Sequence, residues 1–222
     1  MPEPRSPQPP AYRAVVAIGR PIMKLWSRMD VTGLECLPAT GPVLLVADHD
    51  SYWDPIAIAV AAAPVRSIRA LAKSTLWKNP IAARVLDGMG QIPIERGGSN
   101  AASMADAIAA LRGGACIGVF PEGTRSLGRP LRARSGVGRL AQEVPEATVV
   151  CVRVNGTVDV VRFPHRPKVR VEFYRPAGGG RQPDETAIGF AKRLLAELRE
   201  GAPPEVPGRR RTAAKFRAAA DA

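Results

Sequence analysis

A loop rich in ionisable side chains follows one of the apolar runs of the chain. The run PVLLVA at 42–47 leads into DHDSYWDP, which contains His49, one of only two histidines, and Asp54, five residues later. An imidazole titrates near neutral pH, and a carboxylate bonded to one of its ring nitrogens leaves the other free to accept a proton. The pattern therefore predicts that His49 is a general base and that Asp54 orients it.

Asp54 also fits a purely structural role. Asp followed by proline is a preferred N-cap and first position of a helix, so we expect Asp54 to cap a helix that begins at Pro55. A carboxylate fixed at a helix N-terminus is rigid and ionised, and the two roles are compatible.

Two further polar turns follow short apolar runs. MGQIPIERGG at 89–98 places Arg96 beside two glycines, where a guanidinium can grip a phosphate through two parallel hydrogen bonds. VFPEGTRS at 119–126 is the most specific stretch of the chain, because a simple Pro-Gly turn does not need Glu, Thr, Arg and Ser in that order. That turn presents Glu122, Gly123, Thr124 and Arg125 at the sheet edge.

The order of these stretches resembles the lysophosphatidic acid acyltransferase family. DHDSYWD resembles its H-x-x-x-x-D motif, MGQIPIERGG its second motif, VFPEGTRS its third and VVCVRVNGT at 149–157 its fourth. The resemblance covers roughly Val31 to Thr157. Two positions depart from the family pattern. Cys151 stands where a proline is usual, and Asp48, which we expect to raise the imidazole pKa, stands where asparagine is usual.

The resemblance implies an O-acyltransferase that moves a fatty acyl group from a thioester to the free hydroxyl of a lysophospholipid. 1-Acylglycerol-3-phosphate would be the acceptor and phosphatidic acid the product. Acyl-CoA or acyl carrier protein would be the donor, with no bound cofactor and no metal. Family analogy assigns Arg96 to the acceptor's phosphate, and Glu122 and Arg125, in a turn with Gly123 and Thr124, to its glycerol-phosphate head.

Two other functions fit parts of the sequence. The carboxylates around His49 also suit a metal-dependent phosphoesterase, although only His165 remains as a second histidine ligand. A net charge of +12 and an arginine-rich end suit a nucleic-acid-binding module. Aromatic content of only 5% and the lack of a helix-turn-helix or stacking motif argue against that module, so we expect no nucleic acid partner.

Short β-branched runs alternate with helical patterns, which predicts an α/β fold with a mostly parallel central sheet flanked by helices. The resemblance implies that this fold is glycerol-3-phosphate acyltransferase-like. We expect strands near 43–47, 68–72, 91–94, 116–120, 148–154 and 169–174, and helices near 55–63, 80–89, 103–111 and 185–199. The alternating segment PKVRVEFY predicts a strand with one wet face. In such sheets, functional loops lie beyond the carboxyl ends of the strands.

Both ends of the chain predict contact with a membrane. Residues 1–30 read as a proline-rich leader and a helix over 12–29, kinked at Pro21, with an apolar face opposite Arg13, Arg20, Lys24 and Arg28. That apolar face either packs on the domain or lies in lipid, and the unbroken basic side favours an anionic membrane surface. Residues 201–222 read as a basic flexible tail, which leaves 31–200 as the acyltransferase domain.

The cysteines and the apolar runs bear on the compartment. Cys36, Cys116 and Cys151 are odd in number and far apart, which favours a reducing environment. The sequence has no apolar run long enough to span a bilayer. We therefore expect the protein at the cytoplasmic face of the cell membrane, held peripherally or monotopically.

Overall fold

A central sheet organises the computed structural model, which describes residues 8–95, 100–162, 164 and 166–206. The described strands form one sheet in the order β1-β7-β6-β2-β5-β3-β4. The strands β6, β2, β5, β3 and β4 are parallel to one another, whereas β7 runs antiparallel to β6 and β1 parallel to β7. The strand bounds are β1 Asp30–Thr32, β2 Val43–Ala47, β3 Arg69–Lys73, β4 Ile92–Ile94, β5 Cys116–Val119, β6 Thr148–Asn155 and β7 Arg170–Tyr174. The predicted mostly parallel sheet is confirmed.

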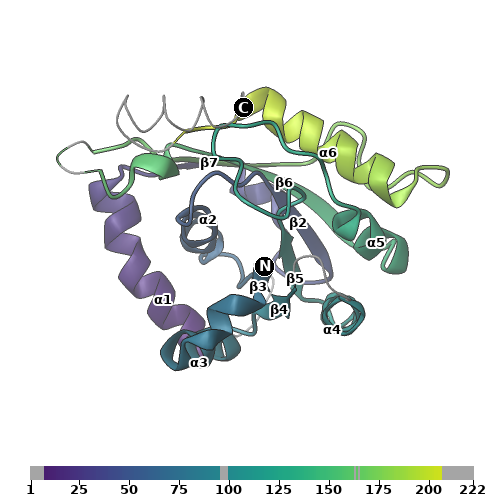
Figure 1. Cartoon of the computed structure of the whole chain (residues 1–222), viewed down its shortest axis with the longest axis horizontal. Helices are drawn as coiled ribbons and strands as arrows, with labels where there is room; N and C mark the ends of the chain where they lie inside the picture. Colours follow the sequence, from purple (N-terminus) through teal and green to yellow (C-terminus); the bar gives the residue numbers. More distant parts are fainter. Residues whose placement is uncertain (1–7, 96–99, 163, 165, 207–222) are drawn as a thin grey trace.

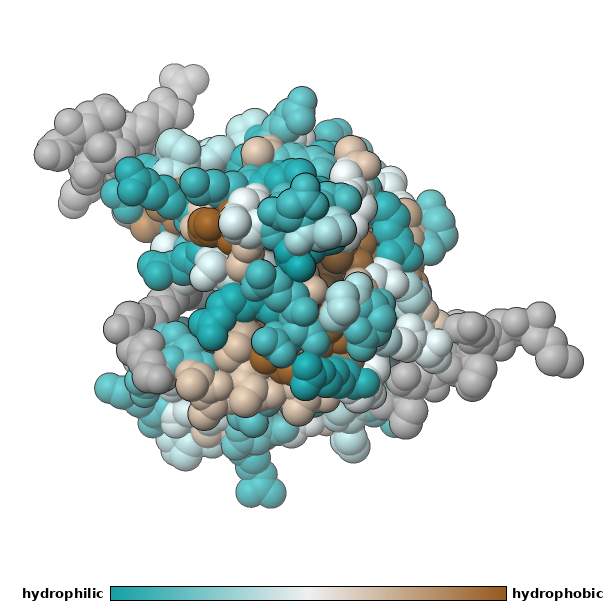
Figure 2. All heavy atoms as spheres, turned by 90° about the vertical axis from the view of Figure 1, so that its right-hand side faces the viewer, coloured by the Kyte–Doolittle hydropathy of each residue, from teal (hydrophilic) through white to brown (hydrophobic). Residues whose placement is uncertain are grey.

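Helices cover both faces of this sheet. Figure 1 shows α2 on one face with α1 outside it, and α5 and α6 on the other face. The helix bounds are α1 Pro10–Pro21, α2 Asp54–Ala62, α3 Pro80–Gly88, α4 Ala101–Arg112, α5 Gly136–Glu143 and α6 Ala187–Gly201. The part of the surface seen in Figure 2, the α5 and α6 side, is mainly hydrophilic, and hydrophobic atoms show mostly in its recesses.

The central strand β2 is buried on both faces, and successive side chains point to opposite sides of the sheet. Leu45 packs in an apolar cluster with Ala57 of α2. Leu44 packs in a second cluster with Leu140 of α5 and Phe190 of α6. Burial on both faces makes β2 a rigid base for the loop that follows it.

Two elements were missing from the sequence-based prediction. The edge strand β1 has only three residues, Asp30–Thr32, too few for a period-two pattern to show. The helix α5 begins Gly-Val-Gly, and glycine disfavours helix, so that segment was not among the predicted helices. The strand β7 does alternate exposed and buried residues, as PKVRVEFY predicted.

The N-terminal helix packs its apolar stripe on the domain. Tyr12 and Met23 are 0% exposed, and the Tyr12 hydroxyl donates to the Ala59 carbonyl at 3.3 Å. At Pro21 the α-helix gives way to a π-helical turn, Ile22–Trp26, so the chain changes helix type at the predicted kink. Most of the face that we expected to meet lipid therefore meets α2 and the core instead. None of the helices in the described ranges is long and apolar enough to cross a membrane.

Candidate active site

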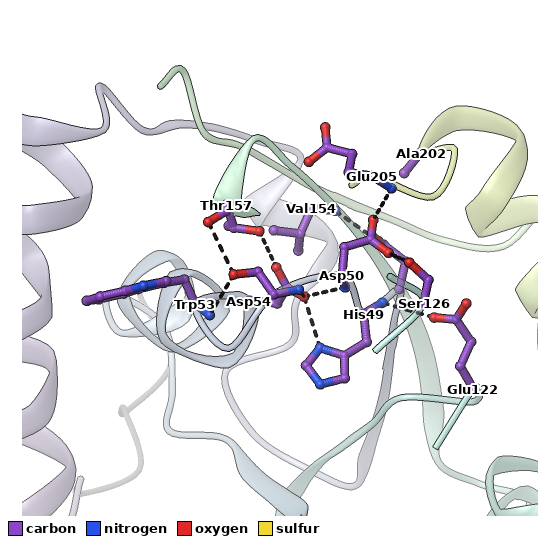
Figure 3. Close-up of polar contacts among 12 residues, drawn as sticks. His49, Asp50, Trp53, Asp54, Glu122, Ser126, Val154, Thr157, Ala202 and Glu205 are labelled. Atoms are coloured by element: carbon purple, nitrogen blue, oxygen red, sulfur yellow. Dashed lines mark hydrogen bonds and ion pairs between the residues drawn. The ribbon is translucent and has the colours of Figure 1, made fainter. Parts of the chain in front are cut away.

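His49 lies in the loop directly after β2. Its Nδ1 is 2.9 Å from Asp54 Oδ2, and its ring stacks on Phe120 with centroids 4.2 Å apart. Because Oδ2 belongs to a carboxylate acceptor, Nδ1 carries the proton and donates it. Within the described ranges no hydrogen bond engages Nε2, and the residue lines a cavity. The predicted pair is therefore brought together, with one ring nitrogen held and the other open (Figure 3).

Asp54 is held by donors on both carboxylate oxygens. Oδ2 also accepts the backbone N–H groups of Asp50 at 2.7 Å and Ser51 at 2.8 Å. Oδ1 accepts the Thr157 hydroxyl. These donors fix the position of the Asp54 carboxylate.

The expected N-cap role of Asp54 is wrong. The helix α2 starts at Asp54 itself, after Trp53, and the carboxylate turns back toward the preceding loop. A side chain that satisfies the N–H groups of its own loop cannot also reach those of the first helical turn.

Thr157 is a site residue that the sequence-based prediction did not include. It follows β6, and besides bonding Asp54 it offers its carbonyl to the Ser51 hydroxyl at 3.2 Å. Thr157 ends the VVCVRVNGT stretch, so the resemblance of that stretch to the fourth motif could have identified it as a site residue. The departure at Cys151 lies inside β6, where the side chain is fully buried, away from these contacts.

Three charged side chains meet behind His49. Glu122 Oε2 accepts the backbone N–H of His49 at 3.1 Å and a donor from Arg199 at 2.7 Å. Arg199 also donates to both carboxylate oxygens of Asp50, at 2.8 and 3.0 Å. Arg199 ends α6 and belongs to none of the motifs, so no sequence signal indicated it.

Burial is the largest influence on the pKa values of the charged groups behind His49. It raises the pKa of Asp48 well above its usual range, against the attraction of Arg199 at 3.7 Å. Burial likewise raises the pKa of Glu122, although hydrogen bonds from Arg199 oppose it. Burial alone would lower the pKa of Arg199, but its bonds to Asp50 and Glu122 outweigh that effect and raise it.

The carboxylates that suggested a metal site are engaged by protein groups. Asp48 accepts the Val154 N–H at 2.9 Å, Asp50 pairs with Arg199, and Asp54 holds the imidazole. The described ranges contain no group of three or more His, Cys, Asp or Glu residues arranged to hold a metal ion. His165, the other histidine, lies outside the described residues.

A cavity of about 680 Å³ opens in front of His49. Its wall is mainly apolar and comes from the helices α1 to α5 and the strands β2, β3, β4 and β5. The apolar wall includes Tyr12, Leu45, Ile58, Ile68, Ala70, Leu86, Met104 and Val119. Such a volume and lining suit a small, largely apolar ligand.

Polar and cationic groups from the VFPEGTRS turn lie at one part of the cavity. Thr124 and Arg125 line it, and the Arg125 guanidinium lies 3.7 Å from the centre of the Tyr52 ring. Arg134 also lines the cavity and packs against Gly123 so closely that an added Cβ would lie 2.6 Å from its Cδ. Gly123 has φ of +67°, so glycine is required there both by backbone conformation and by space.

Of the predicted substrate residues that the structure describes, Glu122 is not brought to this cavity. Glu122 does not line it, because its carboxylate points behind His49 to Arg199. Its observed contacts differ from the role in holding the acceptor that the motif implied. Arg96 lies outside the described residues.

The fold and this site define an α/β protein with a His-Asp pair beside an apolar cavity. The sequence model of a family described as Acyltransferase matches residues 28–155, more than half of the chain. The chain therefore belongs to the acyltransferase family, and the resemblance indicated by its motifs is confirmed at that level.

Individual relatives agree with this assignment. A 1-acyl-sn-glycerol-3-phosphate acyltransferase of Borreliella burgdorferi is 38% identical over 104 residues, covering 46% of this chain and 41% of that protein. One from Bacillus subtilis is 29% identical over 105 residues, covering 47% of this chain and 52% of that protein. The matched part thus spans about half of each curated relative.

A solved structure supports the fold. The 1-acyl-sn-glycerophosphate acyltransferase of Thermotoga maritima superposes with a TM-score of 0.68 at 22% identity, covering 86% of this chain and 78% of that one. This match confirms the predicted fold class.

Proposed function

We propose that this chain transfers a fatty acyl group from a thioester to the free hydroxyl of a lysophospholipid, with 1-acylglycerol-3-phosphate as acceptor. The observation that carries the proposal is the His49 ring, held at Nδ1 by Asp54 and facing an apolar cavity. The match to the acyltransferase family and the names of the relatives support it. No bound cofactor enters the proposal.

In this reaction Nε2 of His49 takes the proton of the acceptor hydroxyl as its oxygen attacks the thioester carbonyl carbon. The C–S bond then breaks, and the leaving thiolate recovers the proton from the imidazolium. Asp54 stabilises the imidazolium while it exists. No acyl-enzyme forms, and the nearby Ser51 hydroxyl already donates to the Thr157 carbonyl.

The lining of the cavity suits both the acyl chain and the phosphate of an acceptor or donor. Its apolar wall suits an acyl chain, and Arg125 and Arg134 suit the phosphate of the acceptor or of the donor. We keep Arg96 in the proposal as a phosphate ligand on the strength of its motif. Glu122 takes the role that its contacts indicate, which is to hold the backbone of His49.

The test is an assay of the purified full chain with acyl-CoA or acyl carrier protein as donor and a panel of lysophospholipids as acceptors. His49→Ala should lower kcat at least a hundredfold, since a positioned general base contributes about 10²–10⁴ in rate. An unchanged melting temperature would show that the variant is folded. Retained turnover would refute the role of His49, and activity lost in excess chelator would favour the metal-dependent alternative.

We also propose that the protein meets its acceptor at an anionic membrane surface. Large apolar side chains remain exposed on the N-terminal helix and on nearby segments: Ile18 at 71%, Leu25 at 70% and Val161 at 73%. Leu25 lies near Val161, because the Trp26 indole donates to the Val160 carbonyl at 2.7 Å. The exposed cations Arg13, Arg20 and Lys24 belong to the same helical segment.

Vesicle sedimentation tests this surface. The double variant Ile18→Ser/Leu25→Ser should bind vesicles of phosphatidylglycerol several-fold more weakly than the wild type, because it loses apolar insertion and keeps the charges. Ile188→Ser, an exposed isoleucine at the start of α6, is the control and should bind as the wild type does. Equal binding by all three proteins would exclude this surface.

A further inference from the structure

Arg199 reaches the catalytic corner from the opposite end of the chain. It lies in the last turn of α6, 149 residues from Asp50 and 77 residues from Glu122. Its side chain is 13% exposed and does not line the cavity. A surface arginine at a helix end often only offsets the helix dipole, but this one points into the protein.

The guanidinium bridges two carboxylates that flank His49. Nη2 donates to Glu122 Oε2 at 2.7 Å and to Asp50 Oδ1 at 2.8 Å, and Nη1 donates to Asp50 Oδ2 at 3.0 Å. Both carboxylates are 1% exposed. Two buried carboxylates so close together repel each other, and the guanidinium between them offsets that repulsion.

Through these carboxylates Arg199 is linked to both the backbone N–H and the backbone carbonyl of His49. Glu122 accepts the His49 N–H at 3.1 Å. Asp50 accepts the Ser126 hydroxyl, and the Ser126 N–H donates to the His49 carbonyl at 2.8 Å. The chain just after α6 adds a further link, because the Glu205 N–H donates to Asp50 Oδ2 at 3.1 Å (Figure 3).

We propose that Arg199 is a positioning residue for the general base. It holds the side chains of Asp50 and Glu122 in place, which fixes the His49 backbone, and its charge contributes to the electric field at the imidazole. The proposal rests on the proposed function of His49, but it adds a residue outside the motifs. The ionisable groups around the imidazole come from its own loop, α2, the VFPEGTRS turn with the chain that follows it, α6 and the segment after α6: Asp48, Asp50, Asp54, Glu122, Arg125, Arg134, Arg199 and Glu205.

The test compares Arg199→Met, Arg199→Lys and Arg193→Met. Arg193 is the control, because it belongs to the same helix but pairs with Glu185, at 2.9 Å, away from His49. Two measurements are made on each protein: the steady-state constants, and the pKa of His49 from its imidazole resonance in an NMR titration. The chain has two histidines, so the resonance that is missing in His49→Ala identifies His49.

We expect Arg199→Met to lower kcat about tenfold or more with little change in the KM of the acceptor. The His49 pKa should rise, because removing a nearby positive charge favours the imidazolium. Arg199→Lys should fall between Arg199→Met and the wild type, and Arg193→Met should change neither quantity. The charge-balanced variant Arg199→Met/Asp50→Asn should return the His49 pKa toward the wild-type value.

An Arg199→Met protein with unchanged kcat and unchanged His49 pKa would overturn the proposal. A raised KM with unchanged kcat would overturn it as well, since Arg199 would then act on the substrate. If Arg199→Met fails to fold, Arg199→Lys and the charge-balanced variant decide by the same two measurements. If the wild type transfers no acyl group, the proposed function fails, and the NMR pKa still tests Arg199.

Discussion

The two sides of His49 are built differently. Behind the imidazole, Asp54, Glu122 and Asp50 are almost fully buried, and each accepts several hydrogen bonds. In front of it, the cavity wall is mostly apolar and its polar groups are few. In the proposed reaction, the rear side fixes the geometry of the general base, whereas the front side selects the substrate by shape and charge.

The rear side is assembled from the carboxyl ends of three neighbouring strands. The strands β6, β2 and β5 are adjacent and parallel, so the loops after them meet at one edge of the sheet. These loops contribute Thr157, Asp54 with His49, and Glu122 respectively. The front side includes, besides strands of the sheet, side chains of the helices α1, α2 and α3 that lie outside these three loops.

The largest effect on activity should come from substituting Asp54, which holds the imidazole from the rear side. Asp54→Asn should lower kcat by about 10²–10⁴-fold, because an amide can donate to Nδ1 and leave the wrong tautomer of His49. Steady-state kinetics across pH would measure the loss. The double variant His49→Ala/Asp54→Asn should be no slower than His49→Ala alone, because the two residues act as a unit. Multiplicative losses would show that they act separately.

A smaller effect, on the preference for acyl chain length, should come from narrowing the cavity in front of His49. Ala70 and Gly118 are paired in neighbouring strands and both line the cavity. Ala70→Leu should lower the kcat/KM ratio of long to short acyl donors by about tenfold, since a methylene or two in an apolar pocket is worth that much. Ala109→Leu, on the exposed side of α4, is the matched control. The same chain-length preference in all three proteins would place the acyl chain elsewhere.

The smallest effect concerns the stability of the rear side at Asp48. The pKa of this carboxyl is raised in the folded protein, so the folded state binds more protons than the unfolded state, and stability falls as pH rises above the ordinary carboxyl pKa. The amide of an asparagine does not titrate in this range. Asp48→Asn should therefore raise the melting temperature at pH 8 by about 2–4 °C, the equivalent of about 1 kcal/mol.

Thermal melts at two pH values check this prediction. The gain should shrink as the pH falls toward 4, because the carboxyl of the unfolded wild type then also becomes protonated. Asp106→Asn, an exposed aspartate on α4, should show no gain at either pH. A destabilised Asp48→Asn protein at pH 8 would mean that the ion pair with Arg199, at 3.7 Å, outweighs the cost of burial.

The sequence predicted the parts of this protein that depend on local pattern. His49 and Asp54 are five residues apart in one loop, and the strands under them have strong periodicity, so both were visible. Arg199 was not, because its partners are 149 and 77 residues away and a helix-end arginine looks ordinary. Glu122 was recognised as a site residue, but its bonds to Arg199 and to the His49 backbone were not predicted, since a motif gives no side-chain direction.

The helix α1 takes part in both the proposed acyl transfer and the proposed membrane contact. Tyr12 and Val15 on one side of it line the cavity, while Ile18 and Arg13 on the other side remain at the surface. Under the proposed acyl transfer and the proposed membrane contact, α1 separates the bilayer from the pocket for the acyl chain. A tilt of this helix on adsorption would change the width of that pocket, so membrane contact and substrate entry would depend on the same helix.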